Sequence, residues 1–331
     1  MTAPLPYAPA RWLPGANAMT VFGSIGRPLP RPPARRERWE LPDGDFLDVD
    51  RAEPAGSGPD AAVLVTCHGL EGSSRAPYVR GLVAHALSRG LATLALNFRG
   101  CSGEPNRLAR SYHSGETGDL ALVVARLAAE RPGRPILLAG FSLGGNVVAK
   151  WLGERGDDLP PEVRGAAVVS VPWDLERSAR AIDGPGFWSF VYRERFMRRL
   201  RAKAAEKARR FPDAFDAAGA ARARTFAEFD AAVTAPMFGF ASAEDYWRRC
   251  SSGTRLAEVR RPLLALSSMD DPIVPAGTIP VAAARANPRV ALETTPAGGH
   301  VAFVAGSPFR PTFWAERRAV EFLAALLPAA T

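Results

Sequence analysis

The chain of 331 residues is poor in cysteine and histidine and has no long apolar run. No stretch approaches the roughly eighteen consecutive apolar residues of a membrane-spanning helix, so the sequence predicts no span. The three cysteines are odd in number and lack metal-ligand spacing, which is typical of a reducing compartment. Residues 1–33 are rich in proline and lack the apolar centre of a signal peptide. We expect a cytoplasmic protein without a metal ion or other cofactor.

The net positive charge is mostly local. The net charge is +8, and nine lysines or arginines lie between Arg193 and Arg210 against two glutamates. Beside these charges lies an apolar stripe of Phe190, Met197, Leu200 and Ala204. Together they predict an amphipathic basic helix. Such a helix fits a solvated face or a peripheral contact with an anionic membrane. Because no recognition motif accompanies the charge, no nucleic-acid partner is expected.

The most informative stretch is Gly140-Phe141-Ser142-Leu143-Gly144. An apolar run over 135–139 precedes it and a helix-forming run over 147–152 follows, so the pattern lies where a strand turns sharply into a helix. Glycines on both sides of the serine permit a tight turn and leave its hydroxyl exposed at the sheet edge. We therefore predict Ser142 as a nucleophile rather than a structural serine in a glycine-rich turn.

A serine nucleophile of this kind is followed in chain order by an acid and then a histidine. The apolar run over 261–267 leads into a turn that carries Asp270 and Asp271. Asp271 is the preferred acid because it directly precedes Pro-Ile-Val-Pro, and proline stiffens the loop that must aim the carboxylate. Asp270, as a residue that caps the turn, and Asp174, which follows an earlier strand, remain alternatives.

Only four histidines compete for the role of the base. His300 fits best, since it follows two glycines on a late loop after the strand-like run 290–294. Of the others, His85 falls on an amphipathic helix, His68 shapes a loop at a strand end, and His113 would break the chain order. The predicted triad is thus Ser142, Asp271 and His300.

Acyl transfer also needs hydrogen-bond donors for the oxyanion that forms at the carbonyl carbon. A buried strand over 61–67 ends in His68-Gly69-Leu70-Glu71-Gly72-Ser73-Ser74, the loop that supplies one backbone N–H in this architecture. We assign that donor to Leu70 and the second to Leu143, which follows the nucleophile. An ordinary glycine-containing turn is the alternative for the Leu70 loop.

Strand-like and helix-like segments alternate, which predicts an α/β fold with a mostly parallel sheet covered on both faces. The strands are expected near residues 61–67, 91–97, 135–141, 165–170, 262–267 and 290–294. A hairpin around Asp43-Gly44 precedes them. We divide the chain into an N-terminal extension (1–34), a core (35–172 and 260–331) and a helical lid inserted after the sixth strand (173–259). Any aromatic residue of the lid could line an acyl pocket or belong to ordinary core: Phe187, Trp188, Phe190, Phe226, Phe229, Phe238, Phe240, Tyr246 and Trp247.

Five segments together resemble the YheT-like family of α/β-hydrolases: residues 68–74, 97–107, 112–117, 140–146 and 298–300. The resemblance extends from about residue 17 to about residue 326. It implies hydrolysis of carboxylic esters, with mammalian relatives that act on acylglycerols or phospholipids, and by position it places the triad on Ser142, Asp271 and His300. One departure is Gly15-Ala16-Asn17-Ala18-Met19-Thr20, which stands where the family has Asn-Pro-His-Leu-Gln-Thr.

The expected function is that of a serine esterase that takes a small-molecule ester and forms an acyl-enzyme. Transfer of the acyl group to an alcohol is an alternative that the triad alone does not separate from hydrolysis. Five residues lie between His113 and Asp119, not the four of an H-x4-D acyltransferase pattern, so hydrolysis is favoured. A non-catalytic lipid-binding protein is the other class, and the ordered nucleophile, acid and base argue against it.

Overall fold

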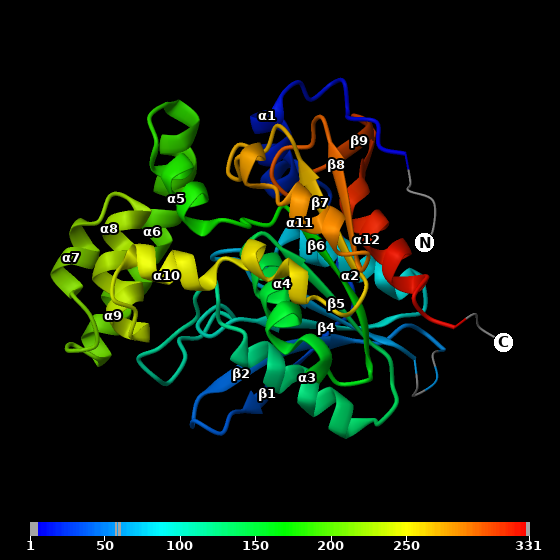
Figure 1. The fold of residues 1–331 in the computed structure, drawn as a ribbon, viewed down its shortest axis with the longest axis horizontal. Coiled ribbons are helices and arrows are strands. Elements are labelled where there is room, and N and C mark those ends of the chain that lie inside the picture. The colour runs from blue at the N-terminus through cyan, green and yellow to red at the C-terminus, as the bar shows by residue number, and fades with distance from the viewer. Residues whose placement is uncertain (1–5, 57, 59–60, 329–331) are drawn as a thin grey trace.

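The computed structural model describes residues 6–56, 58 and 61–328 (Figure 1). Residues 1–5 of the predicted N-terminal extension lie outside this part. One sheet of eight strands crosses the molecule in the order β1-β2-β4-β3-β5-β6-β7-β8. Its strands are β1 Arg35–Glu40, β2 Phe46–Ala52, β3 Val63–Cys67, β4 Ala92–Asn97, β5 Ile136–Phe141, β6 Val163–Val169, β7 Leu263–Ser268 and β8 Val290–Thr295.

Only β2 runs against its neighbours within this sheet, because it pairs antiparallel with both β1 and β4 while the other pairs are parallel. The hairpin predicted around Asp43-Gly44 joins β1 to β2. Each of the six later strands begins and ends within two residues of its predicted range. The predicted fold class is confirmed.

The central strands are apolar throughout because both faces of the sheet are covered, and successive side chains point to opposite faces. In β5, Ile136 and Leu138 pack with α3 Gly118–Glu130 and α4 Leu143–Arg155, while Leu137 and Phe141 pack with α2 Pro77–Ser88 and α12 Trp314–Ala324. Four short helices cover the face on which α3 and α4 lie or form part of the neighbouring loops. They are η2 Gly156–Asp158, η4 Ser252–Glu258, η5 Ala276–Thr278 and α11 Val281–Ala286.

The N-terminal segment is packed on the core rather than extended from it. It forms α1 Ala16–Val21 and the π-helix η1 Phe22–Gly26, which the sequence pattern did not predict. Met19 packs with Val304 and Phe313 of a second hairpin, β9 Val304–Ser307 and β10 Arg310–Phe313. Segments from near the start and near the end of the sequence therefore pack together beside the loop that carries His300.

Residues 173–259, hereafter the helical insertion, lie between β6 and β7 and form the group of helices beside the sheet in Figure 1. Its helices are α5 Leu175–Asp183, α6 Phe187–Arg210, α7 Ala217–Arg222, α8 Phe226–Phe229, η3 Asp230–Thr234, α9 Ala235–Phe238 and α10 Ala243–Cys250, followed by η4, which returns to the core and packs on α4. Leu175 and Tyr246 of the insertion pack with Ile273 and Val274, which lie two and three residues after Asp271. The insertion is thus docked on the edge of the sheet from which the predicted acid emerges.

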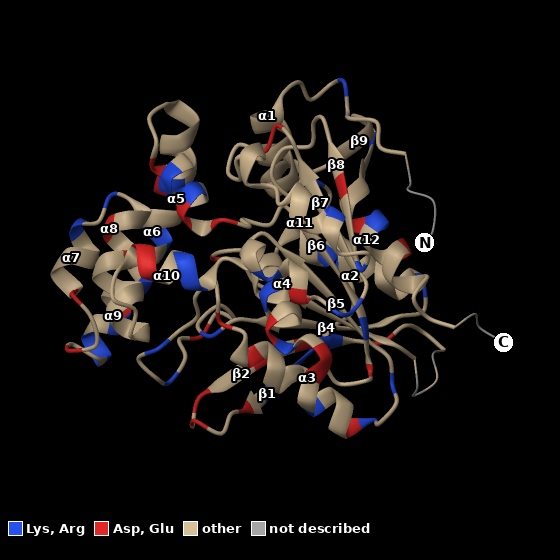
Figure 2. Cartoon of the chain, viewed as in Figure 1, with Lys and Arg blue, Asp and Glu red and all other residues tan. Residues whose placement is uncertain are grey.

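Lysine and arginine are spread over the core and the insertion, with acidic residues among them (Figure 2). Within the described ranges, no helix has both the length and the apolarity to cross a membrane.

Candidate active site

Ser142 occupies a strained turn between β5 and α4. Its backbone has φ 51° and ψ −120°, a conformation that L-residues rarely adopt. A side chain on Gly144 would place a Cβ 2.4 Å from the carbonyl oxygen of Cys67, so glycine is required for the elbow to approach the end of β3. The turn therefore holds the Ser142 hydroxyl at the carboxyl edge of the sheet.

The three residues predicted as a triad meet at this edge. His300 Nε2 lies 3.0 Å from Ser142 Oγ, and His300 Nδ1 lies 2.9 Å from Asp271 Oδ2. Asp271 Oδ1 also accepts the backbone N–H groups of Ile273 at 2.9 Å and Val274 at 3.0 Å. The carboxylate is thus fixed in place and orients the imidazole toward the serine, as a nucleophile, base and acid must be arranged.

The two alternative acids have other partners. Asp270 Oδ1 accepts the backbone N–H groups of Gly298 and Gly299, each at 2.9 Å, and therefore holds the loop that leads to His300. Asp174 caps α5 by accepting the N–H of Arg177 at 2.9 Å. Neither carboxylate has a contact with the imidazole in the part of the chain that the structure describes, so the geometry favours Asp271.

Among the described residues, none of the other histidines is hydrogen-bonded to Ser142 Oγ. His85 is in the last turn of α2. His113 lines the same cavity as Ser142, where burial lowers its pKa to about 3 and its Nδ1 accepts the N–H of Gly115 at 3.1 Å. His68 is fully buried beneath the loop predicted to bind the oxyanion.

His68 fixes the orientation of the peptide that bears the Leu70 N–H. Phe98 N–H points to His68 Nε2 at 3.2 Å, so Nδ1 carries the proton and donates to the Gly69 carbonyl oxygen at 2.7 Å. Burial lowers the pKa of His68 to about 4, which keeps the ring neutral. Because C=O and N–H point in opposite directions across a trans peptide, anchoring Gly69 O turns the Leu70 N–H away from His68.

The Leu70 N–H is left free while its neighbours are bound. Gly69 N–H donates to Tyr78 Oη at 2.9 Å and Glu71 N–H donates to Tyr112 Oη at 2.8 Å. Within the described residues, neither Leu70 N–H nor Leu143 N–H has a protein acceptor, and both residues line the cavity that contains Ser142. Leu143 begins α4, where N–H groups are unpaired and favour negative charge. The arrangement suits the predicted oxyanion site.

Sequence reasoning missed residues that support the site from far along the chain. Thr20 Oγ1 accepts the backbone N–H of His300 at 2.9 Å. Asn146 is fully buried and donates to the carbonyls of Ser114 and Cys250, both at 2.8 Å, which ties the insertion to α4. The segment 15–20 departs from the family pattern, and this departure was the only signal that it borders the site.

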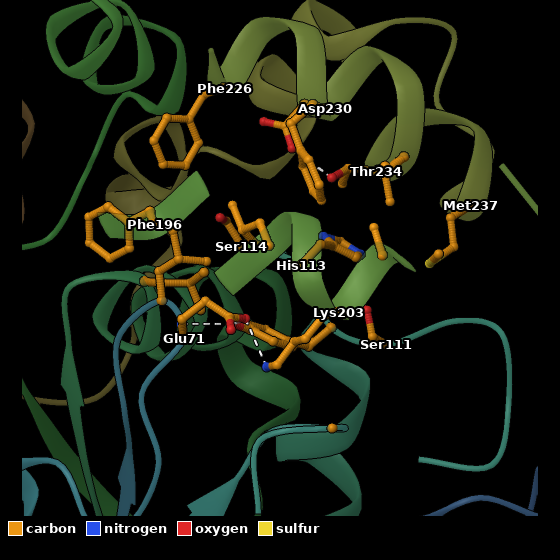
Figure 3. Close-up of a pocket in the computed structure, with 18 of the residues that line it drawn as sticks. Glu71, Ser111, His113, Ser114, Phe196, Lys203, Phe226, Asp230, Thr234 and Met237 are labelled. Atoms are coloured by element: carbon orange, nitrogen blue, oxygen red, sulfur yellow. Dashed lines mark hydrogen bonds and ion pairs between the residues drawn. The ribbon is translucent and has the colours of Figure 1, made fainter. Parts of the chain in front are cut away.

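A cavity of about 380 Å³ extends from Ser142 under the insertion (Figure 3). Its wall is largely apolar and takes side chains from α5, α6, η3 and α9. Five of the predicted aromatic residues line it, together with Phe196, which was not singled out: Phe226, Phe229, Phe238, Tyr246 and Trp247. The other four predicted aromatic residues do not line the cavity. Phe240 is one of them, and the remaining three, Phe187, Trp188 and Phe190, are exposed on the first turn of α6.

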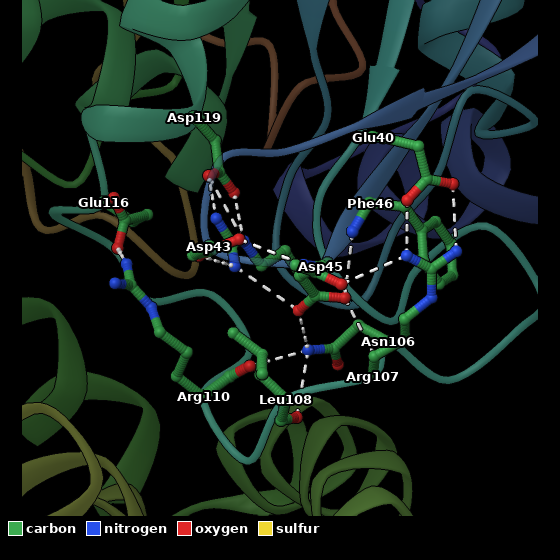
Figure 4. A network of polar contacts seen from close by, with 12 residues as sticks. Glu40, Asp43, Asp45, Phe46, Asn106, Arg107, Leu108, Arg110, Glu116 and Asp119 are labelled. Atoms are coloured by element: carbon green, nitrogen blue, oxygen red, sulfur yellow. Dashed lines mark hydrogen bonds and ion pairs between the residues drawn. The ribbon is translucent and has the colours of Figure 1, made fainter.

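A network of polar contacts holds the loop of residues 99–110, of which Arg99 and Asn106 line this cavity (Figure 4). Asp45, fully buried, accepts from Asn106 Nδ2 at 2.7 Å and from Arg107 N–H at 2.8 Å. Burial opposes ionisation, but these hydrogen bonds outweigh it and keep the pKa of Asp45 below its ordinary value. Arg99 binds the carboxylate of Asp119 at 2.7 Å. The network presents Asn106 to α6, where Lys207 Nζ donates to its side chain at 2.6 Å.

The basic side chains of α6 bind acceptors on both the core and the insertion. Six of its nine basic side chains bind protein acceptors: Arg193, Arg199, Arg201, Lys203, Lys207 and Arg210. Arg199 and Lys203 both bind Glu71, and burial lowers the pKa of Lys207 to about 8. A count of charges does not tell which way each side chain of a helix points, so the sequence alone did not predict these contacts.

Within the described ranges, no cluster of histidine, cysteine, aspartate or glutamate is arranged to hold a metal ion.

Comparisons with known proteins agree with this geometry. The model of the α/β-hydrolase fold family matches residues 62–307. YheT of Escherichia coli K12 is 37% identical over 325 residues, which cover 98% of this chain and 94% of YheT. The chain belongs to the YheT-like family of α/β-hydrolases.

Two further similarities bear on this hydrolase. The monoacylglycerol lipase of Saccharomyces cerevisiae is 33% identical over 274 residues, which cover 81% of this chain and 58% of the lipase. The solved structure of the Pyrococcus furiosus esterase Pf2001 matches with a TM-score of 0.56 over 92% of this chain and all of the esterase, at 17% identity, and shows the shared fold. Relatives of this hydrolase place it among the carboxylic ester hydrolases.

Proposed function

We propose that this hydrolase cleaves carboxylic esters, either short- to medium-chain acyl esters or acylglycerol-like lipids, through Ser142, His300 and Asp271. The observation that carries the proposal is the continuous contact from Asp271 Oδ2 to His300 Nδ1 and from His300 Nε2 to Ser142 Oγ, at 2.9 and 3.0 Å. Leu70 and Leu143 would supply the backbone N–H groups for the oxyanion.

In this mechanism His300 takes the proton of Ser142 as Oγ attacks the ester carbonyl carbon. The tetrahedral oxyanion accepts hydrogen bonds from the backbone N–H groups of Leu70 and Leu143, which have no acceptor among the described residues and need no reorganisation. His300 then returns the proton to the departing alcohol. A water molecule attacks the acyl-enzyme by the same route and releases the acid.

The cavity supports an acyl chain as the group bound beside the nucleophile. Apolar side chains dominate the wall of the cavity that contains Ser142, among them Leu175, Leu200 and Val233. Each buried methylene contributes about 0.8 kcal/mol, so binding should strengthen with chain length until the cavity is filled. The yeast relative is named as a lipase of monoacylglycerols, which agrees with this class of substrate.

An exposed aromatic patch, defined as Phe187, Trp188 and Phe190, supports a lipid surface as the place where such substrates are met. These side chains are 72%, 40% and 55% exposed at the start of α6. Trp188 stacks on Tyr192, whose hydroxyl donates to Asn17 Oδ1 at 2.7 Å, so the patch is connected to the helix that holds the His300 loop. We propose this patch, and not the basic face of α6, as the membrane contact.

The test is hydrolysis of p-nitrophenyl esters of graded length by the wild type and by Ser142→Ala. We expect kcat/KM to rise from acetyl to octanoyl esters, and Ser142→Ala to lose about a millionfold in kcat with its unfolding midpoint unchanged. Turnover by Ser142→Ala close to that of the wild type would exclude the serine mechanism.

Product analysis in the presence of glycerol separates the alternatives. Free fatty acid as the main product supports hydrolysis, whereas a new glycerol ester would show transfer to an alcohol. Saturable binding of a lipid without any product would indicate the non-catalytic class.

A further inference from the structure

Glu71 is a buried carboxylate next to the predicted oxyanion donor, and the proposed mechanism gives it no role. It follows Leu70 directly and has φ 54°, a left-handed conformation that is uncommon for a residue with a side chain. Its side chain is 3% exposed and lines the cavity that contains Ser142. A strained backbone and a buried charge at one position both require compensation from neighbouring groups.

That compensation comes first from Tyr112. The Tyr112 hydroxyl accepts the N–H of Glu71 at 2.8 Å and donates its own proton to Glu71 Oε1 at 2.9 Å. One hydroxyl therefore binds both the backbone and the side chain of Glu71. Tyr112 itself is stacked on Phe98, with ring centroids 5.2 Å apart, which limits its movement.

The second source is helix α6 of the insertion. Lys203 Nζ donates to Glu71 Oε1 at 2.9 Å, and Arg199 Nη1 donates to the Glu71 carbonyl oxygen at 3.0 Å (Figure 3 for Lys203 and Glu71). Arg199 and Lys203 are one helical turn apart, so their side chains leave the same face of α6. Both the carbonyl and the carboxylate of Glu71 are thus bound by one element from outside the core.

We propose that Glu71 and Lys203 act as a positioning pair that couples docking of α6 to the orientation of the Leu70 N–H. This inference rests on the proposed function. When α6 is docked, Lys203 and Arg199 hold Glu71 in its strained conformation, and the oxyanion loop keeps Leu70 N–H facing the cavity. When α6 moves away, Glu71 loses its cation and the loop relaxes. Catalytic competence then depends on closure of the insertion over Ser142.

A purely structural ion pair makes a different prediction. Loss of such a pair would lower the free energy of unfolding but leave the folded protein with normal turnover. Loss of a positioning pair lowers kcat, because the oxyanion is stabilised only in the transition state. It leaves KM for a short ester nearly unchanged, because that ester makes few contacts with the loop before reaction.

The experiment compares Lys203→Met and Glu71→Gln with Arg201→Met in the full-length protein. Arg201 is a matched control, since it is a basic residue of α6 whose contacts are to Glu194 and the Ala223 carbonyl, within the insertion. The measurements are kcat and KM for p-nitrophenyl butyrate, the unfolding midpoint, and the inhibition constant of a trifluoromethyl ketone. Such a ketone forms an oxyanion adduct with the serine nucleophile.

We expect Lys203→Met and Glu71→Gln each to lower kcat by a factor on the order of 10 to 10², up to the loss seen when one oxyanion donor is removed. The ketone should bind more weakly by the same factor, while KM changes less than about twofold. The double variant should be no worse than Glu71→Gln alone, because the two residues act through one contact. Lys203→Arg should restore part of the activity.

Folded Lys203→Met and Glu71→Gln proteins with unchanged kcat would overturn this inference while leaving the proposed function intact. Losses of kcat in Arg201→Met as large as in Lys203→Met would also overturn it, since any disturbance of α6 would then suffice. A wild-type protein without esterase activity would remove the proposed function and this inference together.

Discussion

Thr20 Oγ1 lies 2.9 Å from the backbone nitrogen of His300 and accepts its N–H across 280 positions of sequence. The same hydroxyl donates to the Ala16 carbonyl at 2.8 Å, which ties it to helix α1. The N-terminal segment therefore fixes the loop that carries the proposed base. A hydroxyl that both donates and accepts here cannot be replaced by a methyl group without leaving the His300 N–H unpaired.

Thr20→Val should lower both stability and turnover. Loss of one partly buried hydrogen bond is expected to cost about 1 kcal/mol in the free energy of unfolding, and a less well fixed His300 should lower kcat severalfold. Urea unfolding and kcat for a short ester measure the two effects. Thr20→Ser keeps the hydroxyl and is the control. Equal kcat for Thr20→Val and Thr20→Ser would show that α1 does not position His300.

The adjacent carboxylates Asp270 and Asp271 should respond differently to the same substitution. Asp271→Asn should lower kcat by about 10⁴, because the amide favours the wrong tautomer of His300. Asp270→Asn keeps an oxygen that can accept the N–H groups of Gly298 and Gly299, so its loss of kcat should stay below about tenfold. A loss in folded Asp270→Asn that matches Asp271→Asn would show that the acid has been assigned to the wrong residue.

The sequence was sufficient to bring Ser142, Asp271 and His300 together because each follows a strand of a parallel sheet, and the carboxyl ends of such strands share one edge. The sequence motifs around these three residues were also distinctive. Thr20 lacked such a pattern, since its contact with His300 depends on how α1 packs against β9 and β10. Lys203 was visible only as one charge in a basic run, and its direction is set by the docking of α6 on Glu71.

The aromatic patch on α6 should govern binding to lipid vesicles. Phe187→Ser together with Phe190→Ser is expected to weaken binding severalfold, because both side chains are exposed and their apolar area is what a lipid surface would bury. Hydrolysis of a soluble short ester should not change. Phe309→Ser is the control, since Phe309 is 94% exposed in the β9–β10 turn, outside the patch. Vesicle cosedimentation measures the effect, and equal binding of all three proteins would contradict the membrane contact.

Asp230 in the cavity wall should make stability depend on pH. It accepts from Thr234 Oγ1 at 2.6 Å and Trp247 Nε1 at 2.8 Å, and burial raises its pKa from 3.8 to about 6. The folded state therefore keeps this proton where the unfolded state has released it. This difference contributes at most about 3 kcal/mol to the free energy of unfolding. The contribution is fully present below pH 3.8 and is lost as pH rises through about 6.

Asp230→Asn cannot titrate, so it isolates this contribution. The difference in free energy of unfolding between the wild type and Asp230→Asn should shift in favour of Asn between about pH 4 and about pH 7. Urea unfolding at both values measures the shift. A difference that is the same at both pH values would mean that burial does not raise the pKa of Asp230.

The claim on which the account depends is that Ser142 is the nucleophile, and reaction with a fluorophosphonate probe tests it most directly. The probe forms a covalent bond with an activated serine, and mass spectrometry of the digested protein locates the adduct. We predict a single adduct on Ser142 in the wild type and none in Ser142→Ala. An adduct on a different serine, or none in a preparation that hydrolyses esters, would contradict the account.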